Sequence, residues 1–238
     1  MVMAYEKFYR FYDLVMGDRS KAARYTQSLI EGHNPNAKTV LEIACGTGGI
    51  LGFLADRYEV TGLDRSRQML ALARAKLPHI RFYCRDMTSF ELGRQYDAVV
   101  CVSDSINHLL DFAHWKKVFH RVARQLNDGG VFVLDINTLG KLRRLVEDPP
   151  WVKQIDRDLV IIKVMGGQYG RFDWDVKIFE HRNRANYRLI TETIEEAAFP
   201  LNRIDESLRT TFKTVKVFDP SGARPSDLSE RVYFACRI

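Results

Sequence analysis

The sequence predicts an α/β protein built on a mainly parallel sheet with helices on both faces. Three observations predict this fold class. Short apolar runs alternate with segments of helical periodicity between residues 39 and 136, which is typical of parallel strands joined by right-handed crossovers. A glycine-rich turn, Gly46–Gly49, directly follows the first apolar run. Polar residues, many of them acidic, follow the later runs, at the strand ends where such sheets bind ligands.

Five strands and three helices can be placed in order along this part of the chain. The predicted strands are Thr39–Ala44, Tyr58–Leu63, Ile80–Cys84, Tyr96–Val102 and Val131–Ile136. Apolar residues recur at helical spacing after the first, second and fourth strands. Ser66 and Asp111 precede the second and third helices, and both residue types are favoured N-caps. The third helix is expected to end at Asn127–Gly130.

The pattern changes after Pro150. Three segments then have the alternation of antiparallel strands: Leu159–Met165, Arg171–His181 and Tyr187–Ala197. A short helix and an antiparallel hairpin of two strands, over residues 213–219 and 231–237, complete the chain. We therefore expect seven strands in one main domain and a small antiparallel β lobe inserted before the last strands. The expected boundaries are 1–150 and 200–238 for the main domain and 151–199 for the lobe.

Composition narrows the class of protein. Hydrophobic residues make up 46% of the 238 residues and charged residues 28%, as in ordinary globular proteins. No apolar run reaches the ~18 residues of a membrane span, and the first seven residues lack the apolar stretch of a secretory signal. The four cysteines do not have metal-binding spacing, so we expect no metal site and a reduced, cytoplasmic setting.

The net charge of +6 permits an anionic partner such as nucleic acid. The positive residues are scattered, however, and the densest groups, within 116–124 and 141–144, lack the interleaved aromatic residues of single-strand binders. A solvated surface is therefore the favoured interpretation. The oligomeric state stays open.

The segment Leu41–Gly48 carries the strongest functional signal. A glycine turn after a strand lets a ligand approach the backbone closely. The dinucleotide fingerprint would place a third glycine at position 51, where this chain has Leu51. Glu42, in the strand just before the turn, would face a pyrophosphate unfavourably but suits the ammonium group of a cofactor that contains an amino acid.

Acidic residues also end the next two strands. Asp64 lies eighteen residues after Gly46, where a carboxylate can accept hydrogen bonds from both ribose hydroxyls. Asp86 can accept from an adenine amine, while Met69 and Met87 offer apolar walls to the ring. Each acid alone could be a helix cap or a solvated loop residue, but acids at successive strand ends favour a ligand site.

Together these motifs resemble those of the Rossmann-like S-adenosylmethionine-dependent methyltransferases. The matching segments are Glu42–Gly48, Gly62–Leu70, Arg85–Met87 and Tyr96–Cys101. The resemblance covers about residues 5–136, and the final hairpin also fits. More narrowly, the chain is similar to small-molecule N-methyltransferases such as sugar-amine dimethyltransferases and the glycine and sarcosine group. Phe11–Asp13 with Tyr25, the segment Asp104–Leu109 and the β lobe carry that similarity. The lobe departs from a Glu-x-His pattern of related chains, since it reads Glu192-Thr193-Ile194.

The resemblance implies S-adenosylmethionine as the cofactor and a role for each matching residue. Ala44 and Gly46 would hold the methionine ammonium through backbone groups, assisted by Glu42. Asp64 would bind the ribose, and Asp86 and Met87 the adenine. Val102 and Ser103 would line the methionine arm, and Tyr12 and Tyr25 would close over the cofactor, with core packing as the alternative for both tyrosines. The predicted cofactor site is completed by Cys45, Gly48, Arg65 and Met69.

The predicted reaction is in-line methyl transfer, which mainly requires alignment and a nucleophile with a free lone pair. His108 is the candidate base, because imidazole titrates near neutral pH; the alternative is a histidine that fixes its loop. The expected acceptor is a small molecule, with an amine as the candidate acceptor group. A nucleic-acid methyltransferase is disfavoured because the fourth strand ends in Val102–Ser105 without an Asn/Asp-Pro-Pro-aromatic motif. A nicotinamide-dependent reductase and a non-catalytic cofactor-binding module are the remaining alternatives.

Overall fold

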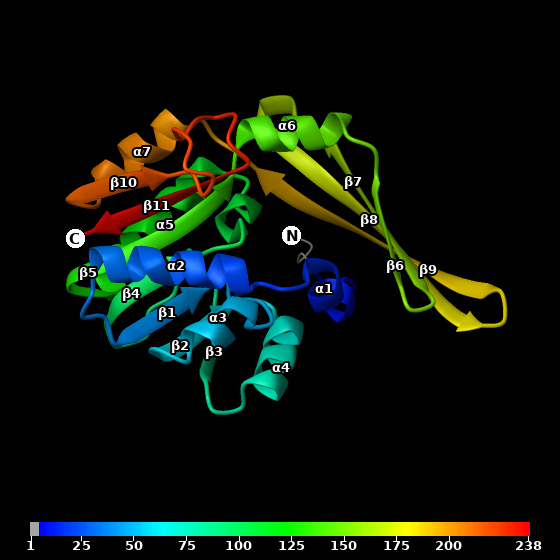
Figure 1. Cartoon of the computed structure of the whole chain (residues 1–238), viewed down its shortest axis with the longest axis horizontal. Helices are drawn as coiled ribbons and strands as arrows, with labels where there is room; N and C mark the ends of the chain where they lie inside the picture. Colours follow the sequence, from blue (N-terminus) through cyan, green and yellow to red (C-terminus); the bar gives the residue numbers. More distant parts are fainter. Residues whose placement is uncertain (1–4) are drawn as a thin grey trace.

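The computed structural model describes residues 5–238 and contains two separate sheets (Figure 1). Met1–Ala4, part of the opening segment that lacks the apolar stretch of a secretory signal, lie outside the described residues. The larger sheet has seven strands in the order β10 (Thr214–Phe218), β11 (Arg231–Arg237), β5 (Leu126–Asn137), β4 (Tyr96–Cys101), β1 (Thr39–Ile43), β2 (Glu59–Asp64) and β3 (Arg81–Cys84). β1 to β5 are parallel, and β11 is antiparallel to both β5 and β10. The predicted mainly parallel sheet with a final antiparallel hairpin is therefore confirmed.

Helices cover both faces of this sheet, as the α/β prediction requires. One face is covered by α2 (Ser20–His33), α3 (Gly49–Leu54) and α4 (Arg67–Lys76), and the other by α5 (Phe112–Gln125) and α7 (Leu201–Arg209). Successive residues of β1 alternate between the two layers, since Val40 packs with the first set and Leu41 with the second. The predicted caps are confirmed: Ser66 accepts from the Met69 N–H and Asp111 from the Ala113 N–H.

The prediction for the start of the fifth strand is wrong. β5 begins at Leu126 and not at Val131, because Leu126 already pairs with Tyr96 of the neighbouring strand. The register then shifts, and Val131 pairs with Ala98, so Asn127–Gly130 form an irregular stretch inside the strand.

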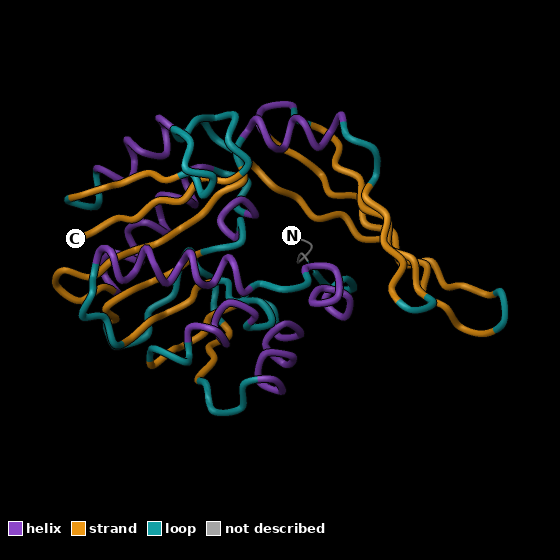
Figure 2. Tube along the Cα trace, viewed as in Figure 1, coloured by secondary structure: helices purple, strands orange, loops and turns teal. Residues whose placement is uncertain are grey.

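The smaller sheet is the predicted β lobe, with one more strand than expected. Its strands are β6 (Trp151–Ile155), β7 (Asp158–Gly166), β8 (Arg171–Asn183) and β9 (Asn186–Ala197), all antiparallel. β6 has only five residues and a hydrophobic alternation too short to stand out in the sequence. The strands form one long, strongly twisted ribbon beside the main sheet (Figure 2).

Two helices lie between the lobe and the main sheet. The helix α6 (Leu139–Glu147) packs Leu142 near the base of the lobe, with Val164 and Phe172. The N-terminal helix α1 (Tyr9–Met16) lies against the lobe further along, in the opening between the two sheets (Figure 1). This arrangement places α1 across the carboxyl ends of the parallel strands.

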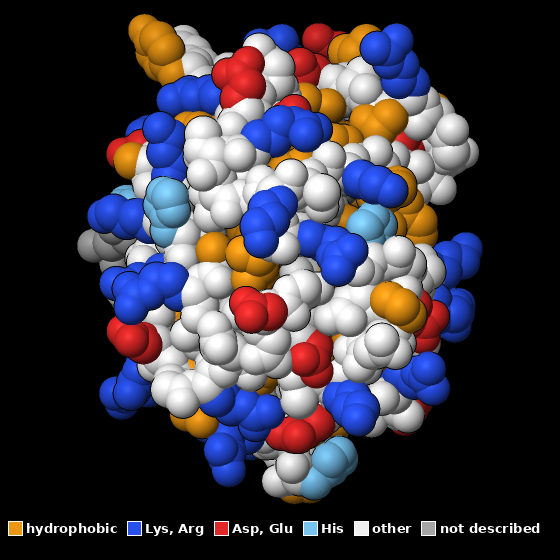
Figure 3. Space-filling model, turned by 90° about the vertical axis from the view of Figure 1, so that its left-hand side faces the viewer, with side chains coloured by type: hydrophobic (Ala, Val, Ile, Leu, Met, Phe, Trp, Pro, Cys, Tyr) orange, Lys and Arg blue, Asp and Glu red, His pale blue; other side chains and the backbone are white. Residues whose placement is uncertain are grey.

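The surface of the main sheet carries mixed charge. In the view of Figure 3, Lys and Arg side chains are scattered among Asp and Glu side chains and do not gather into one patch on that face. No helix within residues 5–238 combines the length and the apolar character needed to cross a membrane.

Candidate functional site

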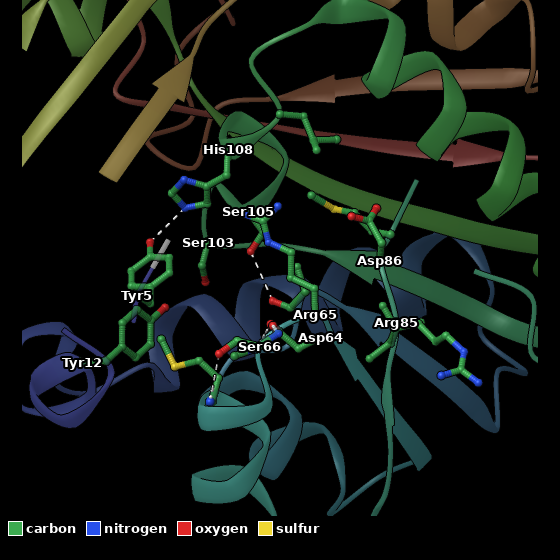
Figure 4. Close-up of a pocket in the computed structure, with 16 residues that line it drawn as sticks. Tyr5, Tyr12, Asp64, Arg65, Ser66, Arg85, Asp86, Ser103, Ser105 and His108 are labelled. Atoms are coloured by element: carbon green, nitrogen blue, oxygen red, sulfur yellow. Dashed lines mark hydrogen bonds between the residues drawn. The ribbon is translucent and has the colours of Figure 1, made fainter. Parts of the chain in front are cut away.

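A cavity opens at the carboxyl ends of β1 to β4 and encloses about 730 Å³, part of it open to solvent (Figure 4). Its floor comes from the turns after the strands, and its lining residues there include Ala44, Gly46, Asp64, Arg65, Ser66, Met69, Asp86 and Met87. Ser103, Ser105 and His108 line it from the segment after β4, which contains the short helix η1 (Ser105–His108). Tyr5 and Tyr12 line it from the N-terminal segment. The cavity therefore lies where ligands bind on parallel sheets.

The turn after β1 has an unusual backbone. Ala44 (φ 54°) and Gly46 (φ 53°) both have positive φ, and so does Gly48 (φ 77°). A side chain at position 48 would also meet Leu77, since an added Cβ would lie 2.9 Å from its Cδ1 atom. The segment after β4 shows the same feature at Ser103 (φ 64°). Left-handed non-glycine residues are rare and gather at functional sites, so both turns have the character of a ligand site.

Asp64 fixes the floor of the cavity. Its Oδ2 accepts from the Gly46 N–H (2.8 Å) and its Oδ1 from the Ser66 N–H (2.7 Å), so one carboxylate ties the glycine turn to the start of α4. Burial raises the pKa of Asp64 above its usual range. Each carboxylate oxygen has a second acceptor position, which leaves Asp64 able to accept from two ligand hydroxyls.

A second cavity of about 380 Å³ adjoins the first and shares Tyr12, Ala44, Ser103 and Ser105 with it. Glu42 and Arg19 both line this second cavity. Glu42 is almost completely buried, burial raises its pKa to about 8, and its Oε2 has no hydrogen-bond partner among the described residues. The Arg19 guanidinium donates to the Ser103 hydroxyl. A buried acid with one unpartnered oxygen and a nearby guanidinium suit the ammonium and the carboxylate of an amino acid.

His108 and Tyr5 meet at the end of the first cavity that faces the lobe. The His108 Nδ1 lies 3.1 Å from the Glu195 carbonyl oxygen, and its Nε2 lies 2.9 Å from the Tyr5 hydroxyl. Because a carbonyl only accepts, Nδ1 carries the proton and Nε2 accepts from Tyr5. Burial lowers the pKa of His108, which favours the neutral ring. Nε2 is therefore the atom able to take a proton.

The carboxyl groups of Asp104 and Glu196 lie next to the His108 ring. One oxygen each of Asp104 and Glu196 lies within 4.8 Å of the other and of a His108 ring nitrogen. Burial acts to raise the pKa of Asp104, but the Arg231 guanidinium and the Lys141 ammonium together outweigh it and hold that pKa low. Burial and the Asp104 charge raise the pKa of Glu196, which accepts from the Asn137 amide (3.0 Å). These groups already have hydrogen-bond partners, so we interpret the cluster as a polar network and not as a metal site.

Comparison with known proteins decides the family. A model of the methyltransferase domain matches residues 40–130. YqeM of Bacillus subtilis, which is assigned as a methyltransferase, is 32% identical over 98% of this chain and 96% of its own length. The chain belongs to the methyltransferase family. The predicted enzyme class and the predicted cofactor, S-adenosylmethionine, are confirmed.

Two further comparisons place the methyltransferase more closely. It is 38% identical to the dTDP-3-amino-3,6-dideoxy-alpha-D-glucopyranose N,N-dimethyltransferase of Streptomyces fradiae, over 52% of this chain and 51% of that protein. The crystal structure of an S-adenosylmethionine-dependent methyltransferase from Clostridium acetobutylicum has the same fold, with a TM-score of 0.84 over 99% of both chains at 24% identity. The resemblance to methyltransferases near the sugar-amine group is therefore confirmed as well.

The structure brings most of the predicted site residues together. Those that line the first cavity are Tyr12, Ala44, Gly46, Asp64, Arg65, Met69, Asp86, Met87, Ser103 and His108. Glu42, Cys45 and Val102 line the second cavity. Gly48 lines neither and contributes through the shape of the turn. Tyr25 also lines neither cavity: its ring packs edge-on against Tyr233, with centroids 4.8 Å apart, so it has the packing role.

Sequence reasoning missed Tyr5, Arg19 and Ser105, which line the cavities. Arg19 could have been found by asking which cation accompanies the buried Glu42. Tyr5 gave no such signal, because only the folded chain brings it to His108, 103 residues away.

Proposed function

We propose that the methyltransferase transfers a methyl group to an amine of a small molecule that binds between His108 and the lobe. One observation carries the proposal: the cofactor cavity ends at His108, and two carboxyl groups, of Asp104 and Glu196, stand behind that histidine. His108 Nε2 accepts a hydrogen bond at this end of the cavity, and the nearby Asp104 carboxylate favours a positive charge there, which together suit an acceptor that arrives as an ammonium group. The similarity to a sugar N,N-dimethyltransferase supports the same acceptor chemistry.

Different residues along the two cavities bind different parts of the cofactor. Asp64 accepts from the ribose hydroxyls, while Asp86 and Met87 hold the adenine. Glu42 and Arg19 hold the ammonium and carboxylate of the methionine part. S-adenosylmethionine, when bound, supplies a methyl group activated on a sulfonium sulfur. Tyr12 covers both cavities and keeps water away from this part of the site.

His108 prepares the acceptor. An ammonium group has no lone pair, so it must lose a proton before it can attack the methyl carbon. Nε2 of His108 takes that proton, and the nearby Asp104 carboxylate stabilises the imidazolium that forms. The Tyr5 hydroxyl relays this proton, since it accepts one proton from the ammonium group and gives its own to Nε2. The lobe, residues 151–199, closes this end of the site as an acceptor-side lid.

Transfer of a labelled methyl group from S-adenosylmethionine to a panel of small molecules tests the proposal. Amino sugars, other primary and secondary amines, alcohols and carboxylic acids are compared with transfer RNA under the same conditions. We expect label in amines, with transfer lost in His108→Gln. Label in RNA, or in hydroxyl or carboxyl compounds to the exclusion of amines, would contradict the proposed acceptor while leaving the cofactor assignment untouched.

A further inference from the structure

We propose that Glu192, on strand β9 of the lobe, is a positioning residue that holds the N-terminal segment so that Tyr5 reaches His108. Through this contact the lobe and α1 form one cover over the cofactor cavity. The inference rests on the proposed role of His108 at the reacting end, and it assigns a function to a lobe residue that touches neither cavity.

The Glu192 carboxylate accepts three backbone hydrogen bonds from the segment before α1. Its Oε1 accepts from the Glu6 N–H (2.6 Å), and its Oε2 accepts from the Phe8 N–H (2.7 Å) and the Lys7 N–H (3.1 Å). Phe8 is the N-cap of α1 and offers no side-chain cap of its own. N–H groups at the start of a helix lack partners within the helix, and a negative charge there is favourable. Glu192 therefore supplies from the lobe a negatively charged partner for the N-cap N–H of α1 and for the two N–H groups before it.

The capped segment begins directly after Tyr5. Tyr5 has a left-handed backbone (φ 69°), which a tyrosine adopts only where neighbouring contacts impose it. Its hydroxyl lies 2.9 Å from His108 Nε2, and its ring meets the His108 ring edge-on at 5.4 Å between centroids. The Tyr12 ring lies edge-on to it at 5.5 Å (Figure 4). Because Glu192 fixes the next three N–H groups, it also fixes where the Tyr5 ring and hydroxyl lie.

The rest of α1 is also held mainly by the lobe. Phe8 and Phe11 are buried among apolar lobe residues, which include Val160, Val176, Ile178, Ile190 and Ile194. Lys153 of β6 donates to the Leu14 carbonyl (2.8 Å), and Arg10 pairs with Glu180 of β8 (3.1 Å). Burial of aromatic side chains is the strong part of this contact.

In contrast to its apolar contact with the lobe, α1 contacts the main domain through the polar side chain of Asp13. Asp13 accepts from the Thr47 hydroxyl (2.5 Å) in the glycine turn and from Lys76 of α4 (2.8 Å). The Asp13 and Lys76 side chains are both nearly half exposed, so the ion pair between them is weak. The cover therefore separates more easily from the main domain than α1 separates from the lobe.

Glu192→Gln tests the inference, with Asp175→Asn as the matched control. Asp175 is a lobe carboxylate on β8 that pairs with Lys177 and lies on the opposite face from Trp174 and Val176. We expect Glu192→Gln to lower kcat/KM about 10- to 100-fold, since misplacing a reacting group by about 1 Å costs that much. Hydrogen exchange at the amides of residues 6–8 should speed up about tenfold or more without a change in the core strands of the lobe. The control should stay within about twofold in both measurements.

A double variant separates positioning from simple loss of stability. If Glu192 acts through Tyr5, the same Glu192→Gln change made in a Tyr5→Phe protein should cost less than about threefold, because the contact it maintains is already gone. Glu192→Asp keeps the charge on a shorter side chain and should recover part of the activity and part of the exchange protection.

Three results would overturn the inference. The first is unchanged exchange at residues 6–8 in Glu192→Gln. The second is an activity loss of the same size with and without the Tyr5 hydroxyl. The third is an equal loss in Asp175→Asn. The exchange measurement needs no acceptor, so it can fail or succeed independently of the proposed amine chemistry.

Discussion

The floor and the cover of the cofactor cavity are built in different ways. The floor comes from turns in which each partner lies nearby along the chain or in the turn of an adjacent strand. Asp64 binds the backbone of Ser66, two residues away, and of Gly46, in the turn after the neighbouring strand β1. The cover comes from residues far apart in sequence. Tyr5 meets His108 across 103 residues, and Phe8 meets Glu192 across 184.

This difference has a physical consequence. Removing a floor residue takes away a group that we propose contacts the cofactor, so the cofactor dissociation constant should change most. Removing a cover residue disturbs the placement of α1 and Tyr5, so turnover should change together with cofactor binding. His108 lies where floor and cover meet and should affect turnover alone.

The largest effect is expected for His108→Gln. Loss of the general base should lower kcat by about 100-fold, while the dissociation constant of S-adenosylhomocysteine stays within about twofold. In the unchanged protein, kcat/KM should stay constant as pH falls through the ordinary titration range of histidine and should decrease only at lower pH. The reason is that burial lowers the pKa of His108, and Nε2 can accept a proton only above that pKa. Steady-state rates across pH and calorimetry measure both. A variant with normal turnover would assign His108 the alternative role of fixing its loop.

Asp64→Ala tests the floor. Loss of an ionised acceptor for two ligand hydroxyls should weaken cofactor binding by roughly 1.5–3 kcal/mol. Asp56→Ala is the matched control, since Asp56 is exposed in the loop after α3. Calorimetry with S-adenosylhomocysteine gives the two dissociation constants. An unchanged constant in a folded Asp64→Ala protein would show that other groups hold the ribose.

The floor was predictable from the sequence because its geometry is local. A strand, a glycine turn and an acid at the next strand end have recognisable spacing, and Ala44, Gly46 and Asp64 lie where that spacing put them. The cover was not predictable, because nothing in the sequence indicates that Tyr5 lies against His108 or that Glu192 binds the backbone of residues 6–8. Tyr25 shows the same limit: its sequence context matched that of a cofactor residue, but tertiary packing placed it against Tyr233.

The two tyrosines give a paired test of this limit. Tyr12 lines both cavities, and Tyr25 lines neither. Tyr12→Ala should weaken cofactor binding about tenfold, equivalent to ~1.4 kcal/mol. Tyr25→Ala should lower the Tm and leave the cofactor dissociation constant within about twofold. Equal weakening in both variants would mean that α2 also belongs to the cover.

A smaller effect is expected on stability at Glu42. Burial raises the pKa of this acid to about 8 in the cofactor-free protein, against an ordinary value of 4.5. The folded state therefore holds a proton that the unfolded state has lost, and Glu42 makes the protein less stable as pH rises from about 5 to about 8. Glu42→Gln removes this contribution, so its stability relative to the unchanged protein should increase by about 1 kcal/mol or more over that range.

Urea unfolding at several pH values measures this difference. Glu196 contributes in the same direction, since its pKa is also raised, but it is common to both proteins and cancels in the comparison. Parallel stability curves for the two proteins would contradict a buried, protonated Glu42.

Hydrogen exchange with and without S-adenosylhomocysteine tests most directly whether floor and cover enclose one cofactor site. The account predicts slower exchange in the floor turns, residues 44–48 and 64–69, and also in the cover, residues 6–16 and the part of β9 around Glu192. Protection confined to the floor, with no change in α1 or the lobe, would contradict a cover formed by α1 and the lobe together.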